Sequence, residues 1–173
     1  MNAVGLRRGF LAAPVLVAAF LAGKTSSLQG QTDTFSRETN PLVLAAIRKA
    51  SVRLTDPRCQ RVFSDFQDRE GRTLQEKLTS LGYTGQEYLE QIRFYEASWT
   101  ANCDGDGVLA ATSPGSRIVY LCGLKLIERT IRNPGYPVAV AVIIHEELHS
   151  LGLGENPPSS AEITRQVVSR CGG

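Results

Sequence analysis

The spacing of hydrophobic residues divides the chain near residue 92 into a helical first part and a mixed second part. In the first part apolar residues recur as they do on one face of a helix, and each run follows a helix start signal. These signals are Asn40-Pro41, Asp56-Pro57 and the capping-box pair Thr84 and Glu87. They predict a helix over 41–54, a second from 57, and two short helices that meet near Gly82.

The pattern changes after Ile92 to short runs of aromatic and β-branched residues, which favour strands. Three segments have this composition: the one around Phe94, Tyr95 and Trp99, residues 108–112, and residues 117–122. A Ser-Pro-Gly-Ser turn joins the last two. The sequence therefore predicts a small sheet from about 92 to 122, followed by a short helix over 124–131.

Residues from Pro137 to Leu151 are apolar on nearly every side until His145. Their valines and isoleucines have strand propensity, but the length of the run and its initial proline favour a buried helix. A last helix is predicted from Ser159 or Ser160 to near Cys171. The expected fold class is α+β, helix-rich, with a small sheet packed on the buried helix.

Residues 1–30 have the features of a secretory signal peptide, with Arg7 and Arg8 before an apolar run over 10–23. The run is shorter than the ~20 residues that span a bilayer, so no stable membrane anchor is expected. Cleavage is placed between about 22 and 30. We expect an exported protein, secreted or periplasmic, whose single domain covers 31–173 and begins with a loose polar lead-in to residue 39.

Charge excludes two classes of partner. The chain has 19 basic and 17 acidic residues, and the predicted signal segment takes Arg7, Arg8 and Lys24 with it, which leaves 19 minus 3, or 16, against 17. No basic block or stripe remains, so neither a nucleic acid nor a membrane surface is an expected partner.

The four cysteines are Cys59, Cys103, Cys122 and Cys171. An even number in an exported chain predicts two disulfides, with three connectivities to choose from. We favour Cys103–Cys122, which would tie neighbouring extended segments, and Cys59–Cys171, which would pin the last helix to the N-terminal half. Metal binding by these thiols is the alternative, although none lies in a CxxC spacing.

The two histidines, His145 and His149, are four residues apart, with Glu146 directly after the first. Positions i and i+4 of a helix share one face, so both imidazoles can reach one metal ion. Glu146 would then lie beside the metal, where it can take a proton from water whose pKa the metal has lowered. The alternative is a buried helix that happens to carry two histidines, although burying imidazoles without partners is costly.

The segment HEELH resembles the HExxH motif of the zincin metalloproteases, and HEELHSLGLGE (145–155) is similar to the metzincin pattern HExxHxxGxxH. The resemblance implies a zincin-like fold, zinc ligands at His145 and His149, and Glu146 as catalytic base. Gly152 stands where metzincins turn sharply out of the helix. Two departures are Glu155 in the place of the third histidine and no methionine after Met1, which leaves no methionine turn.

The third zinc ligand has two candidates. Glu155 has the metzincin spacing and follows two glycines, whereas Glu162 lies on the next predicted helix, as the glutamate ligand of gluzincins does. Glu162 also completes a capping box with Ser159, a purely structural role. Either carboxylate with two histidines leaves a fourth coordination position for water.

The predicted function is a secreted zinc metallopeptidase that acts on a peptide or protein substrate. An extended substrate would add to the edge strand near 108–122. Tyr120 and Tyr136 are candidate oxyanion stabilisers, or else packed aromatic residues. Two alternatives stay open: a secreted disulfide-bonded binding or structural module with a non-catalytic metal, and a zinc hydrolase of a non-peptide amide. The oligomeric state is left open.

Overall fold

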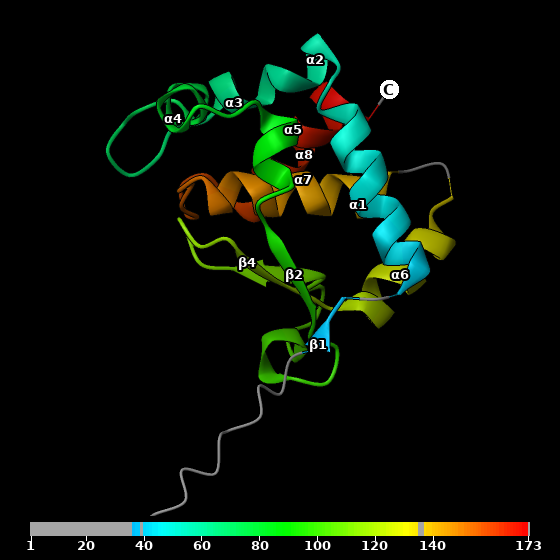
Figure 1. Cartoon of the computed structure of the whole chain (residues 1–173). Helices are drawn as coiled ribbons and strands as arrows, with labels where there is room; N and C mark the ends of the chain where they lie inside the picture. Colours follow the sequence, from blue (N-terminus) through cyan, green and yellow to red (C-terminus); the bar gives the residue numbers. More distant parts are fainter. Residues whose placement is uncertain (1–35, 39, 135–136, 173) are drawn as a thin grey trace, which may run out of the picture. The chain divides into compact units, whose positions relative to one another are not determined.

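The computed structural model of the chain describes residues 36–38, 40–134 and 137–172. The predicted signal peptide and Tyr136 therefore lie outside the described residues. The elements in chain order are β1 (Ser36–Arg37), α1 (Pro41–Arg53), α2 (Pro57–Gln60), α3 (Val62–Asp65), α4 (Leu74–Leu81), α5 (Gly85–Leu89), β2 (Arg93–Glu96), the 3-10 turn η1 (Ala101–Cys103), β3 (Ala110–Thr112), β4 (Ile118–Leu121), α6 (Gly123–Arg132), α7 (Val138–Ser150) and α8 (Ser160–Cys171). Helices and a small sheet thus occur together, as predicted (Figure 1).

The predicted helix starts are confirmed by their caps. The side chains of Asn40 and Asp56 accept hydrogen bonds from the backbone N–H groups of Leu42 and Arg58, which begin α1 and α2. Thr84 and Glu87 form the expected reciprocal capping box at α5. These bonds satisfy amide groups that the first helical turn leaves without a partner.

The sheet has four strands in the order β1-β2-β4-β3. The central pair β2–β4 is parallel, whereas β1 and β3 pair antiparallel at the two edges. Two expectations are wrong here. Residues 36–37 belong to a strand rather than to a loose lead-in, because they pair with β2. Trp99 lies outside β2 and is 87% exposed, because the strand ends at Glu96, whose carboxylate accepts the Ser98 N–H.

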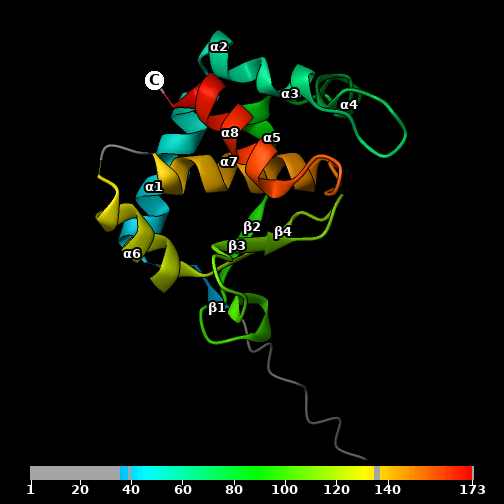
Figure 2. The same ribbon diagram turned by 180° about the vertical axis from the view of Figure 1, so that it is seen from behind.

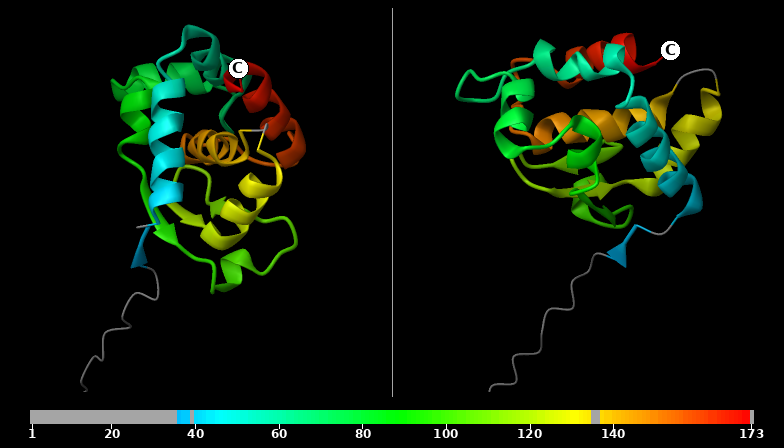
Figure 3. Two further views of the ribbon diagram at one scale, coloured as in Figure 1. Left: turned by 90° about the vertical axis from the view of Figure 1, so that its right-hand side faces the viewer. Right: turned by 45° about the horizontal axis from the view of Figure 1, so that its top comes forward.

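Helix α7 lies at the centre of the described domain. The sheet lies on one side of α7, and α2 and α8 lie on the other, while α1 crosses it (Figures 1 and 3). Its residues Ile143, Ile144 and Leu148 are completely buried. A helix satisfies its own backbone hydrogen bonds, so it can be enclosed in this way, and packing overrides the strand propensity of the β-branched residues.

Both disulfides have the pairing that the sequence favoured. Cys59–Cys171 joins α2 to the end of α8, and Cys103–Cys122 joins η1 to the start of α6. All four cysteines are thereby used, which removes the thiols as metal ligands. Two disulfides indicate an oxidising environment. Among the helices of the described ranges, none is long and apolar enough to cross a membrane.

Candidate metal centre

Helix α7 brings the two imidazoles together on one face. The Nε2 atoms of His145 and His149 lie 3.0 Å apart, and each residue is only 5% exposed. Glu155 Oε1 lies 3.2 Å from His149 Nε2 and 3.6 Å from His145 Nε2. A tetrahedral ion with bonds of ~2.0–2.1 Å separates two neighbouring ligand atoms by about 3.3 Å. These three donor atoms, referred to below as the triad, could therefore hold a metal ion.

The turn after α7 is what carries Glu155 to the histidines. Gly152 has φ +113, a conformation that residues with a side chain rarely adopt. From there its N–H donates to the His149 carbonyl, and the Leu153 N–H donates to the Leu148 carbonyl. The helix is thus closed and the chain reverses, which explains why a glycine is required between the second histidine and Glu155.

The outer nitrogen of each ring has its own partner. His149 Nδ1 lies 2.8 Å from the Leu153 carbonyl oxygen, which can only accept, so Nδ1 carries the proton. The Nε2 atom of His149 faces the other two atoms of the triad. His145 Nδ1 lies 2.9 Å from Thr164 Oγ1 on α8. Such outer partners orient the imidazoles of metal sites.

The electrostatics of the triad favour a cation. Burial, and secondarily the neighbouring His149, lower the pKa of His145 to about 4, so this imidazole is neutral at pH 7. Within the described ranges Glu155 forms no ion pair with a lysine or arginine. Two imidazole nitrogens and a carboxylate oxygen consequently converge, which is a donor set suited to a divalent metal ion.

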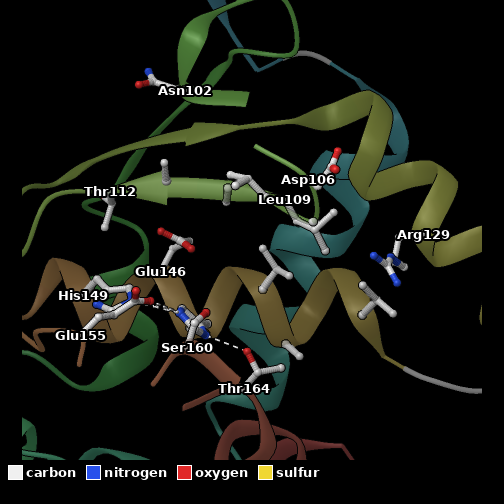
Figure 4. A pocket seen from close by; sticks show the side chains of 18 of the residues that line it. Asn102, Asp106, Leu109, Thr112, Arg129, Glu146, His149, Glu155, Ser160 and Thr164 are labelled. Carbon is white, nitrogen blue, oxygen red and sulfur yellow. Dashed lines mark hydrogen bonds and ion pairs between the residues drawn. The ribbon is translucent and has the colours of Figure 1, made fainter. Parts of the chain in front are cut away.

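Glu146 is a buried carboxyl group beside the triad. Its Oε2 has no hydrogen-bond partner within the described part of the chain. Burial, and then the charge of Glu155, raise the pKa of Glu146 to about 8. Figure 4 shows its side chain projecting from α7 toward β3, with Thr112 opposite. A carboxyl group with this pKa is suited to exchanging protons near neutral pH.

A cleft of about 1140 Å³ lies between α7 and β3, and the triad lies within it. It extends from Glu155 to Arg129 on α6 (Figure 4), with apolar walls that include Leu109 and Val142. The Gly115 N–H donates to the His149 carbonyl at 2.9 Å. That bond joins the turn between β3 and β4 to the end of α7, and so keeps the edge strand beside the triad.

Two predicted site residues lie elsewhere, and Tyr136 falls outside the described ranges. Glu162 caps its own helix, where its carboxylate accepts from the Ser159 N–H and hydroxyl, and these bonds lower its pKa. That local bond directs the side chain to the start of α8, so Glu162 is not part of the triad. Tyr120 does not line the cleft, because its ring lies beside Tyr95 with the ring centroids 6.3 Å apart.

Three features of the site are not predicted by the sequence. They are the hydroxyl of Thr164, the carbonyl of Leu153, and Arg129 at the far end of the cleft. A carbonyl has no side-chain signal. Thr164 follows the buried Ile163 on α8. This position suggests that Thr164 lies near the inward side of the helix, but it does not identify His145 as the residue that Thr164 contacts.

Comparison with known proteins adds no relative: the chain matches no family model, no curated protein and no solved structure. The similarity to the HExxH pattern thus stands on residues 145–155 alone.

Proposed function

We propose that this chain is an exported, zinc-dependent metallopeptidase that hydrolyses peptide bonds in the cleft between α7 and β3. The observation that supports this most strongly is the buried carboxyl of Glu146, one oxygen of which has no hydrogen-bond partner among the described residues, beside the three converging atoms of the triad. A structural zinc site uses four protein ligands, whereas two histidines and one carboxylate leave a position open. Placed in an open cleft, such a site favours catalysis over a purely structural role.

His145, His149 and Glu155 are the residues that would hold the ion. Bound there, zinc supplies Lewis acidity that polarises a carbonyl group and makes water more acidic. The positive charge also favours the ionised form of Glu146, which its burial otherwise opposes. The Glu146 carboxylate would accept a proton from the attacking water and pass it to the departing amine.

Strand β3 is suited to hold the substrate in line with these groups. It lies at one edge of the sheet, with β4 as its neighbour on the other side. An extended peptide can add to such an edge through backbone hydrogen bonds, which are independent of sequence. Residues 110–112 of β3 line the cleft, so a peptide placed there would pass over Glu146.

Paired substitutions on adjacent positions of α7 test the proposal. Glu146→Gln should keep one zinc per chain and lower hydrolysis of a mixed peptide pool by about 10²–10⁴-fold, because it removes the general base. Glu147→Gln is the matched control: Glu147 is completely buried and does not line the cleft, so this variant should keep both zinc and activity.

The remaining outcomes separate the alternatives. A Glu146→Gln protein as active as wild type would refute the proposed mechanism. If zinc binds but neither peptides nor other amides are hydrolysed, the chain is a binding or structural module with a non-catalytic metal. Hydrolysis confined to non-peptide amides, and dependent on Glu146, would replace the peptide substrate and keep the chemistry.

A further inference from the structure

A second concave surface lies between α1 and α6, away from the metal centre. This groove has a volume of about 860 Å³, and its floor includes the buried side chains of Val43, Ala46 and Leu126. Three large apolar side chains also line it and are unusually exposed: Leu42 at 59%, Val52 at 68% and Ile131 at 68%. Clusters of exposed apolar side chains of this kind mark binding surfaces.

The charge around the groove has one sign. Arg48, Lys49 and Arg53 of α1 line it, and none of the described residues that line it is acidic. None of these three cations forms an ion pair with a side chain in the described ranges. Three positive charges that have no ion-pair partner in the described part of the chain therefore border an apolar channel.

We propose that this groove binds an amphipathic helical segment of a partner protein whose flanks are acidic. A helix that places apolar residues at i, i+3, i+4 and i+7 presents a stripe that fits such a channel. Aspartate and glutamate beside the stripe would then pair with the three cations of α1. Attraction between opposite charges also speeds the encounter of the two proteins.

Charge and shape argue against the other occupants. Residues 1–32 of the chain contain no acidic residue, and they include Arg7, Arg8 and Lys24, so this segment does not complement the groove. Two copies that met through the same face would bring two basic surfaces together, which costs free energy. A membrane is flat on this scale, whereas the apolar surface is concave.

Helix α6 contributes residues to the lining of both the groove and the cleft. Arg129 of α6 and its C-cap residue Asn133 line the cleft, and Val138 lines both the cleft and the groove. Figure 1 shows α6 beside α1. A segment bound in the groove would thus contact the back of the helix that forms one end of the cleft. The inference holds whether or not the cleft hydrolyses peptides.

A display selection on the intact chain tests the proposal. A library of helical peptides should yield binders enriched in aspartate and glutamate on either side of an apolar stripe. Binding of the selected peptides, measured by fluorescence anisotropy, should weaken at least about tenfold in the double variant Val52→Asp/Ile131→Asp and in Arg48→Glu/Arg53→Glu. Leu124→Asp is the matched control, since Leu124 is 51% exposed on α6 but does not line the groove.

Four results would overturn the proposal. The first is a selection that yields no binders, or binders without acidic residues, and the second is binding that the groove variants leave unchanged. The third is a dimer of the wild-type chain in sedimentation that Val52→Asp/Ile131→Asp dissociates, which would make a second copy the occupant. The fourth is binding to vesicles that contain phosphatidylserine, lost in the groove variants, which would assign the surface to a membrane.

Discussion

The disulfide Cys59–Cys171 closes most of the described domain into one covalent loop, so its removal should lower the free energy of unfolding by a large amount. Its two residues are 112 positions apart, whereas Cys103 and Cys122 are separated by 19. We consider the double variant Cys59→Ala/Cys171→Ala and compare it with Cys103→Ala/Cys122→Ala. Both pairs are buried, so the packing lost on truncation is similar and the loop length differs.

The magnitude follows from the chain entropy of the unfolded state. A cross-link that closes a loop of this length removes unfolded-state entropy worth about 4.8 kcal/mol at 25 °C, against about 3.3 kcal/mol for the short loop. Removal of the long-loop disulfide should therefore cost about 1.5 kcal/mol more. Because domains of this kind are stable by only ~5–15 kcal/mol, the first variant should be close to unfolding.

Loss of the long-loop disulfide should also lower the affinity of the triad for zinc. Cys171 ends α8, the helix whose Thr164 holds the outer nitrogen of His145. The ion pair Arg170–Asp65, at 2.8 Å, stays in place and keeps part of this attachment. Zinc affinity should therefore fall in Cys59→Ala/Cys171→Ala and stay near wild type in the short-loop variant.

Urea unfolding of both variants and wild type, followed by circular dichroism in the presence of a chelator, measures the free energies without a contribution from bound metal. Zinc titration with a competing chromophoric chelator measures the affinities. A short-loop variant that is destabilised as much as the long-loop variant, or more, would refute the entropic argument. Equal zinc affinities in the two variants would refute the role assigned to α8.

Three further predictions follow from single side chains. Thr164→Val keeps the size of the side chain but removes the hydroxyl beside His145, and should weaken zinc binding by ~10–100-fold in the same titration. Gly152→Ala should weaken zinc binding and lower the free energy of unfolding by more than ~1 kcal/mol, because alanine disfavours φ +113; an unchanged urea midpoint would refute the role of this turn. Burial raises the pKa of Glu147 well above its ordinary value of 4.5, so the native state holds a proton that the unfolded chain releases as pH rises through that value. The free energy of unfolding of the wild type should therefore fall above that pH. The variant Glu147→Met lacks both this proton and the buried polar oxygens, so it should be about 1–3 kcal/mol more stable than wild type at pH 7. The difference in stability should be smaller at pH 4.

The sequence predicted best the elements whose causes are local. Asn40 and Asp56 lie directly before the helices that they cap, so the residue type alone marks the start of α1 and α2. The motif on α7 is equally local, because four residues of helix bring the Nε2 atoms of His145 and His149 within 3.0 Å of each other. Strand β1 carries no such signal: its two residues form a strand because β2 lies beside them, and that pairing joins distant parts of the chain.

The third candidate ligand shows the same limit of the sequence. The sequence leaves Glu155 and Glu162 as alternatives, because Glu155 has the metzincin spacing and Glu162 lies on the following helix, as the glutamate ligand of gluzincins does. Two local features of the structure separate them. The left-handed turn at Gly152 returns Glu155 to the histidines, and the capping box with Ser159 keeps Glu162 at the start of its helix. Figure 2 shows α7 and α8, the helices on either side of this segment. The contact of Thr164 with His145 depends on how those two helices pack, which no local pattern specifies.

The most direct test of the account is a crystal structure of the zinc-loaded protein, with anomalous diffraction measured at the zinc edge. The account predicts one zinc per chain, about 2.0–2.2 Å from His145 Nε2, His149 Nε2 and a carboxylate oxygen of Glu155, with a non-protein ligand in the fourth position. An anomalous peak at another site, a carboxylate of Glu162 in place of Glu155, or imidazoles that face apart with no ion between them would contradict it.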